Sequence, residues 1–353
     1  MIPLFKPYMP DIGGILDVLN SGQLTYGNYT QLFEKNLQDY LNEPYVMVTN
    51  SFHTAITVAL TAMGIGYGDE VIASPMACLA STQPYLTSGI GVRWADIDPN
   101  RGTLLPESVE KNISSKTRAI VHNHFCGYPG YIDEINAIGK KFGIPVIDDG
   151  IECFGSIYKG NRIGHCGTDV TIFSLTAVRI PNCIDGGAIV FKNREAYEKA
   201  LLARDCGIDR KNFRDEIGEI NPECDISMIG QSATMSNVNG YIGLMQMKFV
   251  DNLIEMQRKQ AQKWNEYFVN NQEEVPINVN HGLPNYWVYG ILAKNKKKTI
   301  CEFREKGYYA SGIHIRNDLY SVFEKSNSTL IGVTEFNNKF VGIPCGWWMD
   351  DQI

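Results

Sequence analysis

Between Tyr45 and Lys192 the chain alternates short apolar, β-branched runs with amphipathic segments long enough for a helix. Continuous apolar strands that alternate with helices are typical of a mostly parallel sheet covered on both faces. The alternation predicts an α/β fold whose ligands bind beyond the carboxyl ends of the strands. The expected strands are Val46–Val48, Glu70–Ala73, Gly91–Trp94, Ala119–His122, Pro145–Ile147, Thr171–Phe173 and Ala188–Phe191.

Beyond residue 237 the pattern changes. A helical repeat of apolar residues runs from about Val238 to Asn270, and a strand-like stretch, Tyr286–Leu292, follows it. We therefore predict two domains. The large one takes residues 1–240, including an N-terminal segment, and a smaller α+β domain takes residues 241–353, beginning with a bridging helix.

Composition excludes several classes of protein. The 353 residues are 44% hydrophobic and 20% charged, as in soluble globular enzymes. A net charge of −7 argues against a nucleic-acid partner. No stretch approaches the ~20 apolar residues that span a bilayer, and the N-terminus lacks the apolar centre of a signal peptide. Nine cysteines without a CxxC pair favour a reduced, cytoplasmic location.

Two segments carry candidate ligand-binding residues at the ends of expected strands. In one, a buried strand leads into the carboxylates Asp149 and Glu152. In the other, Ser174 ends a strand and Arg179 follows it. Because parallel strands end at the same edge of a sheet, we expect these residues to lie close together.

The order and spacing of motifs along nearly the whole chain resemble those of the DegT/StrS-type sugar aminotransferases. These enzymes have aminotransferase fold type I and use pyridoxal phosphate (PLP). The motifs are, in order, Ser21-Gly22, Tyr26-Gly27, Gly68–Ile72, Ala95–Asp98, Asp148-Asp149, Tyr158–Gly160, Gly164, Gly167–Val170, Phe173-Ser174, Gly186-Gly187 and Met235–Asn237. The resemblance implies a nucleotide-linked keto-sugar as substrate and a homodimer that shares its active site, with residues 232–237 as the shared loop.

The resemblance also implies a cofactor site. Asp149 matches the carboxylate that pairs with the pyridine nitrogen of PLP and keeps the ring protonated, so that the ring accepts electrons. Glu152 matches a polar residue near the ring hydroxyl. Ser174 matches a hydroxyl near the cofactor phosphate.

Arg179 departs from the family pattern at the most consequential position. It stands where the family has the lysine that holds the cofactor as an imine. A guanidinium stays protonated at any working pH and offers no nitrogen lone pair, so it cannot form that imine. PLP or its amine form, pyridoxamine phosphate (PMP), would then be held without a covalent bond.

Other departures cluster around the same expected ligand. Phe52 and His53 replace a Gly-Thr pair that holds phosphate, and a large residue is a poor substitute where backbone approaches an anion. Cys78 stands where an aromatic residue stacks on the ring. The candidate cofactor-binding residues are Ser51, Phe52, His53, Cys78, Asp149, Glu152, Ser174 and Ser232.

Several histidines are candidate general bases, since histidine titrates nearest neutrality. His53, His122 and His124 are the candidates, and we name His124 together with Arg179 as the catalytic positions. His122 and His124 would share one strand face and, with Cys126, offer metal ligands. No paired spacing supplies further ligands, and the family has a histidine at the His124 position without a metal. We therefore predict no metal site.

In the smaller domain, Gly312–Asp318 resembles the segment that approaches the substrate in the family. Arg316 would suit the diphosphate of a nucleotide sugar, and His314 lies beside it. The alternative, that both are exposed strand residues, stays open.

The leading hypothesis is a PLP-dependent sugar aminotransferase-like protein of deoxy-amino-sugar and surface polysaccharide synthesis. Transamination itself is in question because of Arg179. One alternative is a catalytically inactive homologue that acts as a partner or regulatory subunit. Another is a lysine-free, dehydratase-like enzyme that uses the amine form of the cofactor.

Overall fold

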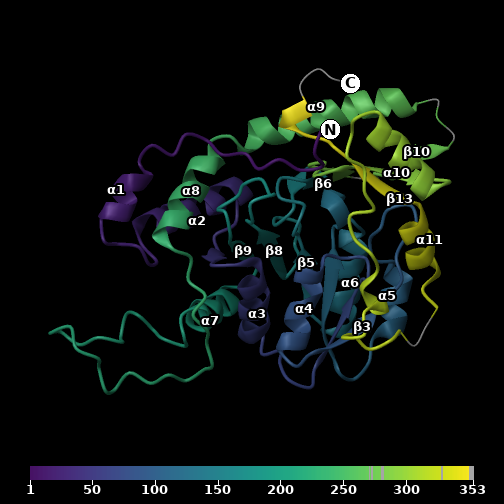
Figure 1. Ribbon diagram of the computed structural model, residues 1–353. Coiled ribbons are helices and arrows are strands. Elements are labelled where there is room, and N and C mark those ends of the chain that lie inside the picture. The colour runs from purple at the N-terminus through teal and green to yellow at the C-terminus, as the bar shows by residue number, and fades with distance from the viewer. Residues whose placement is uncertain (270, 272, 280–281, 327–328, 350–353) are drawn as a thin grey trace.

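The computed structural model describes residues 1–349 apart from 270, 272, 280, 281, 327 and 328, and its centre is a seven-stranded sheet (Figure 1). In spatial order the strands are β1 (Val46–Thr49), β9 (Gly187–Phe191), β8 (Val170–Ser174), β5 (Val146–Asp149), β4 (Thr117–Asn123), β2 (Glu70–Ala73) and β3 (Gly91–Trp94). The strands from β8 to β3 are parallel, and β9 runs antiparallel to both of its neighbours. The predicted α/β fold is confirmed.

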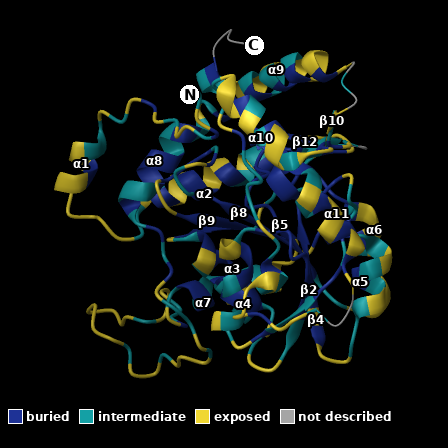
Figure 2. Ribbon diagram, turned by 45° about the vertical axis from the view of Figure 1, so that its right-hand side comes forward, coloured by how far each residue is buried: buried dark blue, intermediate teal, exposed yellow. Residues whose placement is uncertain are grey.

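Helices cover both faces of this sheet. They are α2 (Asn28–Leu41), α3 (Phe52–Ala62), α4 (Leu79–Thr87), α5 (Pro106–Asn112), α6 (Ile132–Phe142) and α7 (Arg194–Arg204). The short helix α1 (Ile15–Asn20) lies away from the sheet (Figure 1). Met47 and Ile189 belong to the apolar core that includes α3, whereas Val46 and Val190 belong to the core that includes α2. Successive side chains of a strand point to opposite faces, so these strands are buried on both sides (Figure 2).

A second, antiparallel sheet of β10 (Glu274–Pro276), β12 (Tyr289–Ala293) and β13 (Phe340–Ile343) lies toward the C-terminus. Its helices are α10 (Lys296–Glu305) and α11 (Ile331–Lys339), and it packs on Trp264 of α9 (Val250–Phe268). A small third sheet joins β6 (Ile157–Tyr158), β7 (Asn161–Arg162) and β11 (Gly282–Leu283).

The prediction of one helix over 238–270 is wrong, because two helices, α8 (Asn237–Met247) and α9, occupy that stretch. The N-terminal segment contacts the junction of the two helices. The Tyr8 ring packs on Phe249 at 5.6 Å, and the Tyr8 carbonyl accepts a hydrogen bond of 2.7 Å from Gln246 Nε2. These contacts hold the two helices at their junction.

The first residues of the chain lie against the C-terminal part. The Ile2 N–H donates to the Gly307 carbonyl at 2.7 Å, and the Ile2 carbonyl accepts from the Tyr309 N–H at 2.9 Å. The Phe5 ring stacks on Trp287, with ring centroids 4.2 Å apart. The division into domains near residue 240 stays a prediction.

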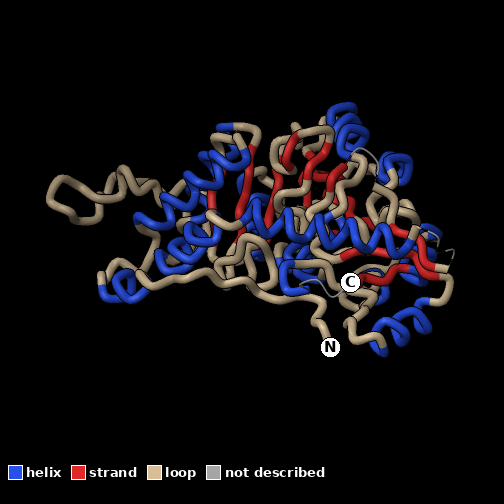
Figure 3. The backbone as a smooth tube through the Cα atoms, turned by 90° about the horizontal axis from the view of Figure 1, so that it is seen from above, coloured by secondary structure: helices blue, strands red, loops and turns tan. Residues whose placement is uncertain are grey.

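An arm formed by residues 205–236 leaves the body of the molecule between α7 and α8 (Figures 1 and 3). Its base is held by isolated bridges that pair Asp205 with Ser232 and Thr49 with Thr234. Much of the arm is exposed (Figure 2). Among the described residues, no helix has the length and hydropathy needed to cross a membrane.

Candidate functional site

The carboxyl ends of β5 and β8 bring the predicted carboxylates and Arg179 together. Asp149 is the last residue of β5 and Ser174 the last of β8, and these strands are parallel neighbours. Glu152 follows β5, and Arg179 follows β8 in a turn whose Arg179 N–H donates to the Thr176 carbonyl at 2.9 Å. Arg179 and Glu152 form an ion pair, with 3.7 Å between Nη2 and Oε1.

Asp149 is a buried carboxylate that receives only neutral hydrogen bonds. Asn123, the last residue of β4, donates from Nδ2 to Oδ2 at 2.8 Å, and the Ile151 N–H donates to Oδ1 at 3.2 Å. Burial raises the pKa of Asp149, although the Ser81 and Asn123 side chains oppose that rise. No described basic side chain forms an ion pair with it. A protonated pyridine nitrogen would supply a cationic partner, so this position fits the ring of PLP.

Glu152 is held as an anion by three donors. Its Oε2 accepts from the Cys126 N–H at 2.7 Å, and its Oε1 lies 3.2 Å from His314 Nε2 and 3.7 Å from Arg179 Nη2. Burial alone would raise the pKa of Glu152, but His314, Arg179 and the Cys126 N–H together lower it. Glu152 is therefore ionised at neutral pH, and it joins residues of both parts of the chain.

Arg179 is buried and stacked on Trp287, with its guanidinium carbon 4.2 Å from the ring centroid. The indole Nε1 of Trp287 donates to the Val178 carbonyl at 3.0 Å, which fixes the ring relative to the turn. Burial lowers the pKa of Arg179 and Glu152 opposes that change, so the guanidinium stays charged. Its Nε and Nη1 have no hydrogen-bond partner among the described residues.

A cavity of about 20 Å³ lies beside Arg179 and is also bounded by Glu152, Ser174 and Trp287. That volume is enough for about one water molecule or one ligand oxygen. The free donors of Arg179 therefore suit a single acceptor atom.

The N-terminus of α3 offers the expected phosphate contacts through its backbone. Ser51 caps the helix by accepting from the Thr54 N–H at 3.1 Å. The N–H groups of Phe52 and His53 have no acceptor among the described residues, and free N–H groups at a helix N-terminus bind anions. The Phe52 ring packs into the main core. The Phe52 side chain is therefore directed into the core. That Phe52 is a poor substitute for the small residue of the family stays a prediction.

The other predicted phosphate-side residues make local contacts. The His53 ring is exposed and its Nε2 lies 3.3 Å from the Thr87 hydroxyl. Ser174 Oγ lies 3.0 Å from Thr176 Oγ1. Ser232, at the base of the arm, accepts from Asn50 Nδ2 through its carbonyl at 3.2 Å. Ser232 thus lies beside the start of α3 by its backbone.

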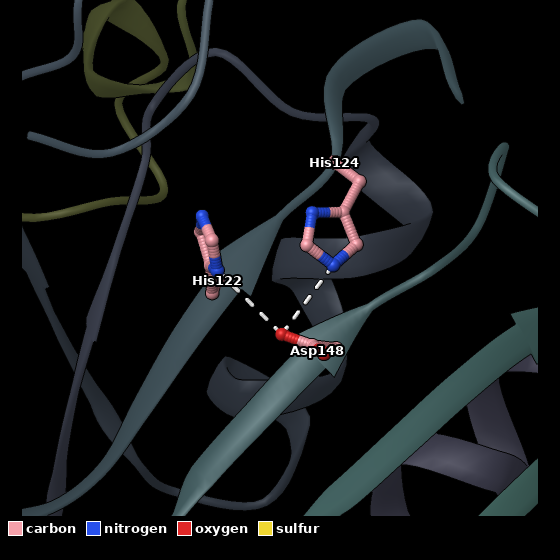
Figure 4. Close-up of side chains that lie close together, drawn as sticks. All are labelled: His122, His124 and Asp148. Carbon is pink, nitrogen blue, oxygen red and sulfur yellow. Dashed lines mark ion pairs between the residues drawn. The ribbon is translucent and has the colours of Figure 1, made fainter. Parts of the chain in front are cut away.

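His122 and His124 of the β4 end converge on Asp148 of β5 (Figure 4). His122 Nδ1 and His124 Nε2 lie 3.5 Å and 3.4 Å from Asp148 Oδ1, and all three side chains are buried. His124 Nδ1 accepts from the Gly130 N–H at 3.2 Å. The proton of a neutral His124 ring is therefore on Nε2, facing Asp148, and that nitrogen has no lone pair for a metal or for a proton from a ligand.

Protonation in this cluster follows from burial. Burial lowers the pKa of His122, and Asp148 only partly opposes it, so His122 is neutral. Burial would raise the pKa of Asp148, but His124 and His122 outweigh it and lower the pKa. His122 and His124 thus lie at ion-pair distance from an ionised carboxylate. Neither forms a hydrogen bond of normal geometry with it, and His122 Nε2 and Asp148 Oδ2 also have no hydrogen-bond partner among the described residues.

We expect chelation to leave this protein unchanged. Because the Gly130 N–H occupies His124 Nδ1, the unfolding temperature should be the same in EDTA and in excess Zn²⁺, as measured by scanning calorimetry. A rise with Zn²⁺ in the native chain that disappears in His122→Gln would contradict this assignment and establish a metal site.

The structure separates His314 from Arg316. His314 joins the site through Glu152. Arg316 donates from Nε and Nη2 to the Asp318 carboxylate at 2.7 and 2.6 Å, and from Nη1 to the Thr334 hydroxyl at 2.7 Å. Its guanidinium is already engaged, so no donor is directed at the Arg179–Glu152 pair.

Three site residues were not foreseen. Trp287 stacks on Arg179, Asn123 holds Asp149, and Asn285 donates from Nδ2 to the Glu152 carbonyl at 2.7 Å. Asn123 directly follows the expected strand Ala119–His122 and lies between two histidines in the sequence, so its position was a usable signal. Trp287 and Asn285 are far from Arg179 in sequence, and no spacing connects them to it.

The site cysteines are thiols. Burial raises the pKa of Cys78 and Cys126, and the charge of Glu152 raises both further. A protonated thiol is a weak nucleophile and a weak metal ligand. Cysteine-based catalysis is therefore disfavoured.

A model of the DegT/DnrJ/EryC1/StrS aminotransferase family matches residues 11–332. The sugar aminotransferase CalS13 from Micromonospora echinospora is 26% identical, with a TM-score of 0.93 over 99% of this chain and 96% of that one. AtS13 from Actinomadura melliaura is 27% identical, with a TM-score of 0.93 over 100% and 95%. Spr1654 from Streptococcus pneumoniae in its PMP form is 20% identical, with a TM-score of 0.89 over 99% and 94%, and shows the shared fold alone.

Proposed function

Because the chain belongs to the DegT/DnrJ/EryC1/StrS aminotransferase family, we propose that it binds PLP or PMP without a covalent bond and acts on a nucleotide-linked keto-sugar. The reaction would belong to deoxy-amino-sugar synthesis for surface polysaccharides. The observation that carries this proposal is Asp149, a buried carboxylate at the carboxyl edge of the sheet with no cationic partner among the described residues.

Different residues would bind the two ends of the cofactor, its pyridine ring and its phosphate. Asp149 would hold the pyridine nitrogen, and the Phe52 and His53 N–H groups with the Ser174 hydroxyl would hold the phosphate. When bound, the cofactor supplies an electron sink for a carbanion. Glu152 stays ionised beside Arg179 and His314 and orients both.

Arg179 limits the reaction. In this family's chemistry a lysine amine exchanges the imine and carries the proton, and a guanidinium can do neither. Arg179 instead holds an anionic oxygen with Nε and Nη1 and keeps Glu152 ionised. Full transamination is therefore expected to be slow, and a lysine-free, dehydratase-like reaction with PMP is the alternative that this arrangement favours.

We expect Asp149→Asn to weaken PLP and PMP binding by about 1.5–3 kcal/mol, roughly 10- to 150-fold, because a hydrogen bond to a charged partner is lost. Fluorescence titration of the pure protein measures the dissociation constants. Asp133→Asn, at an exposed carboxylate that pairs with Lys159, should leave them unchanged.

Unaltered affinity in Asp149→Asn would place the cofactor elsewhere. Failure of the native chain to bind PLP, PMP or a uridine-diphospho-keto-sugar would overturn the proposed function. The departures from the family pattern at Arg179 and Cys78 would then favour the alternative of a catalytically inactive homologue that acts as a partner or regulatory subunit.

A homodimer is part of the proposal. Large apolar side chains are exposed on the arm, with Ile217 at 84% and Ile229 at 87%. Exposed apolar groups of this size favour burial against a partner, and the base of the arm is hydrogen-bonded to Asn50, which precedes Ser51 at the proposed phosphate end. A second copy would cover the arm and share the active site. A single-chain mass by light scattering would contradict this.

A further inference from the structure

His314 and Glu152 form a carboxylate–imidazole pair at the junction of the two parts of the chain. The ionised Glu152 accepts at Oε1 from His314 Nε2 at 3.2 Å. That contact places the proton of the neutral ring on Nε2 and leaves the lone pair on Nδ1. No described residue forms a hydrogen bond with Nδ1. A carboxylate that fixes the tautomer of a histidine is the arrangement used for general bases.

The ring is accessible to a ligand. His314 lines a groove of about 480 Å³, together with Phe5, Trp287, Tyr309 and Ile313. Its side chain is 18% exposed, whereas that of Glu152 is 1% exposed. The carboxylate is therefore shielded from water, while the His314 side chain is partly exposed at the groove.

The other described histidines are not placed for this role. His122 and His124 are fully buried against Asp148, and His53 is turned outward to Thr87. His165 forms a similar pair with Glu43, at 2.6 Å, away from the Arg179 site. His314 is the one that shares a carboxylate oxygen with Arg179.

We propose that His314, oriented by Glu152, is the proton-transfer residue of this site and removes the proton from the carbon beside the carbonyl of a keto-sugar. The C–H bond breaks, an N–H bond forms at His314 Nδ1, and the electron pair moves into the carbonyl group to give an enolate. The imidazolium then returns a proton to the same carbon. The step needs no oxidant and no amine, and it rests on the substrate class of the proposed function.

Arg179 supplies the positive charge for this step. Its Nε–H and Nη1–H are free donors beside a cavity for one oxygen. Phe5 and Trp287 bound both that cavity and the groove of His314. A donor aimed at the oxygen that gains charge stabilises the transition state more than the ground state. Arg179, which cannot form an imine, would thus stabilise the enolate.

The test is exchange of carbon-bound hydrogen in D2O. Cofactor-free protein is incubated with a uridine-diphospho-4-keto-hexose, and deuterium at the carbons flanking the carbonyl is followed by NMR. His314→Gln should slow exchange about 100-fold or more, as expected for loss of a general base. Calorimetry should show the same dissociation constant for the sugar. His165→Gln, which breaks the comparable pair with Glu43, should leave the exchange rate unchanged.

The role of Glu152 has a separate readout. Nitrogen-15 spectra of the His314 ring should show the Nε2–H form in the native chain and a mixture of tautomers in Glu152→Ala. Sugar binding without exchange, or exchange equally fast in His314→Gln, would overturn the assignment while leaving the proposed function standing. Absence of sugar binding would overturn both.

Discussion

Arg204→Met is expected to lose about 3–5 kcal/mol of unfolding free energy, the cost of leaving one member of a buried ion pair alone. Arg204 Nη1 of α7 lies 2.5 Å from Glu34 Oε1 of α2, and both side chains are buried. The same nitrogen donates to the Val48 carbonyl at 2.9 Å. Removing the guanidinium leaves a buried carboxylate at the contact of two helices and β1.

Urea unfolding measures this loss. Arg194→Met is the matched control on the same helix, since its ion pair with Glu198 is exposed and exposed pairs contribute about 0–1 kcal/mol. A double variant, Glu34→Leu with Arg204→Met, should recover part of the loss because no unpaired charge remains. A loss in Arg204→Met no larger than in Arg194→Met would show that the pair is solvated.

Arg179→Lys is expected to gain an imine with PLP that the native chain lacks. The turn holds this position through the Thr176 carbonyl and through Trp287, which donates to the Val178 carbonyl. Burial favours the neutral form of a lysine amine, and the neutral amine adds to an aldehyde. The absorbance spectrum should show a visible imine band, and borohydride should fix the cofactor to residue 179, located by peptide mass.

The matched control is Arg162→Lys. Arg162 stacks on Tyr40, at 4.1 Å from the ring centroid, but lies outside the site. It should give no trapped cofactor. If Arg179→Lys binds PLP and still forms no imine, position 179 is not the counterpart of the family lysine. Binding by neither chain would favour a protein partner over a cofactor.

The large sheet could be predicted because its signal is local. Strands such as Gly187–Phe191 are apolar at successive positions, and helix-length amphipathic segments separate most of the strands, so composition within a few residues specifies them. The break between α8 and α9 could not be predicted in this way. At the break, Gln246 and Phe249 contact Tyr8, which comes from the other end of the chain.

In the candidate site, too, some features could be predicted from local sequence and others could not. Asp149, Glu152 and Ser174 were expected together because adjacent parallel strands end at one edge, and the chemistry of Arg179 follows from the guanidinium group itself. The partners of Arg179 depended on the tertiary structure. Trp287 stacks on Arg179 and His314 contacts its ion-pair partner Glu152, both from the C-terminal part of the chain. The two ring nitrogens of His124 face the Gly130 N–H and Asp148. Residue types and strand order determine which groups are available, but only packing decides which lone pairs and donors remain free.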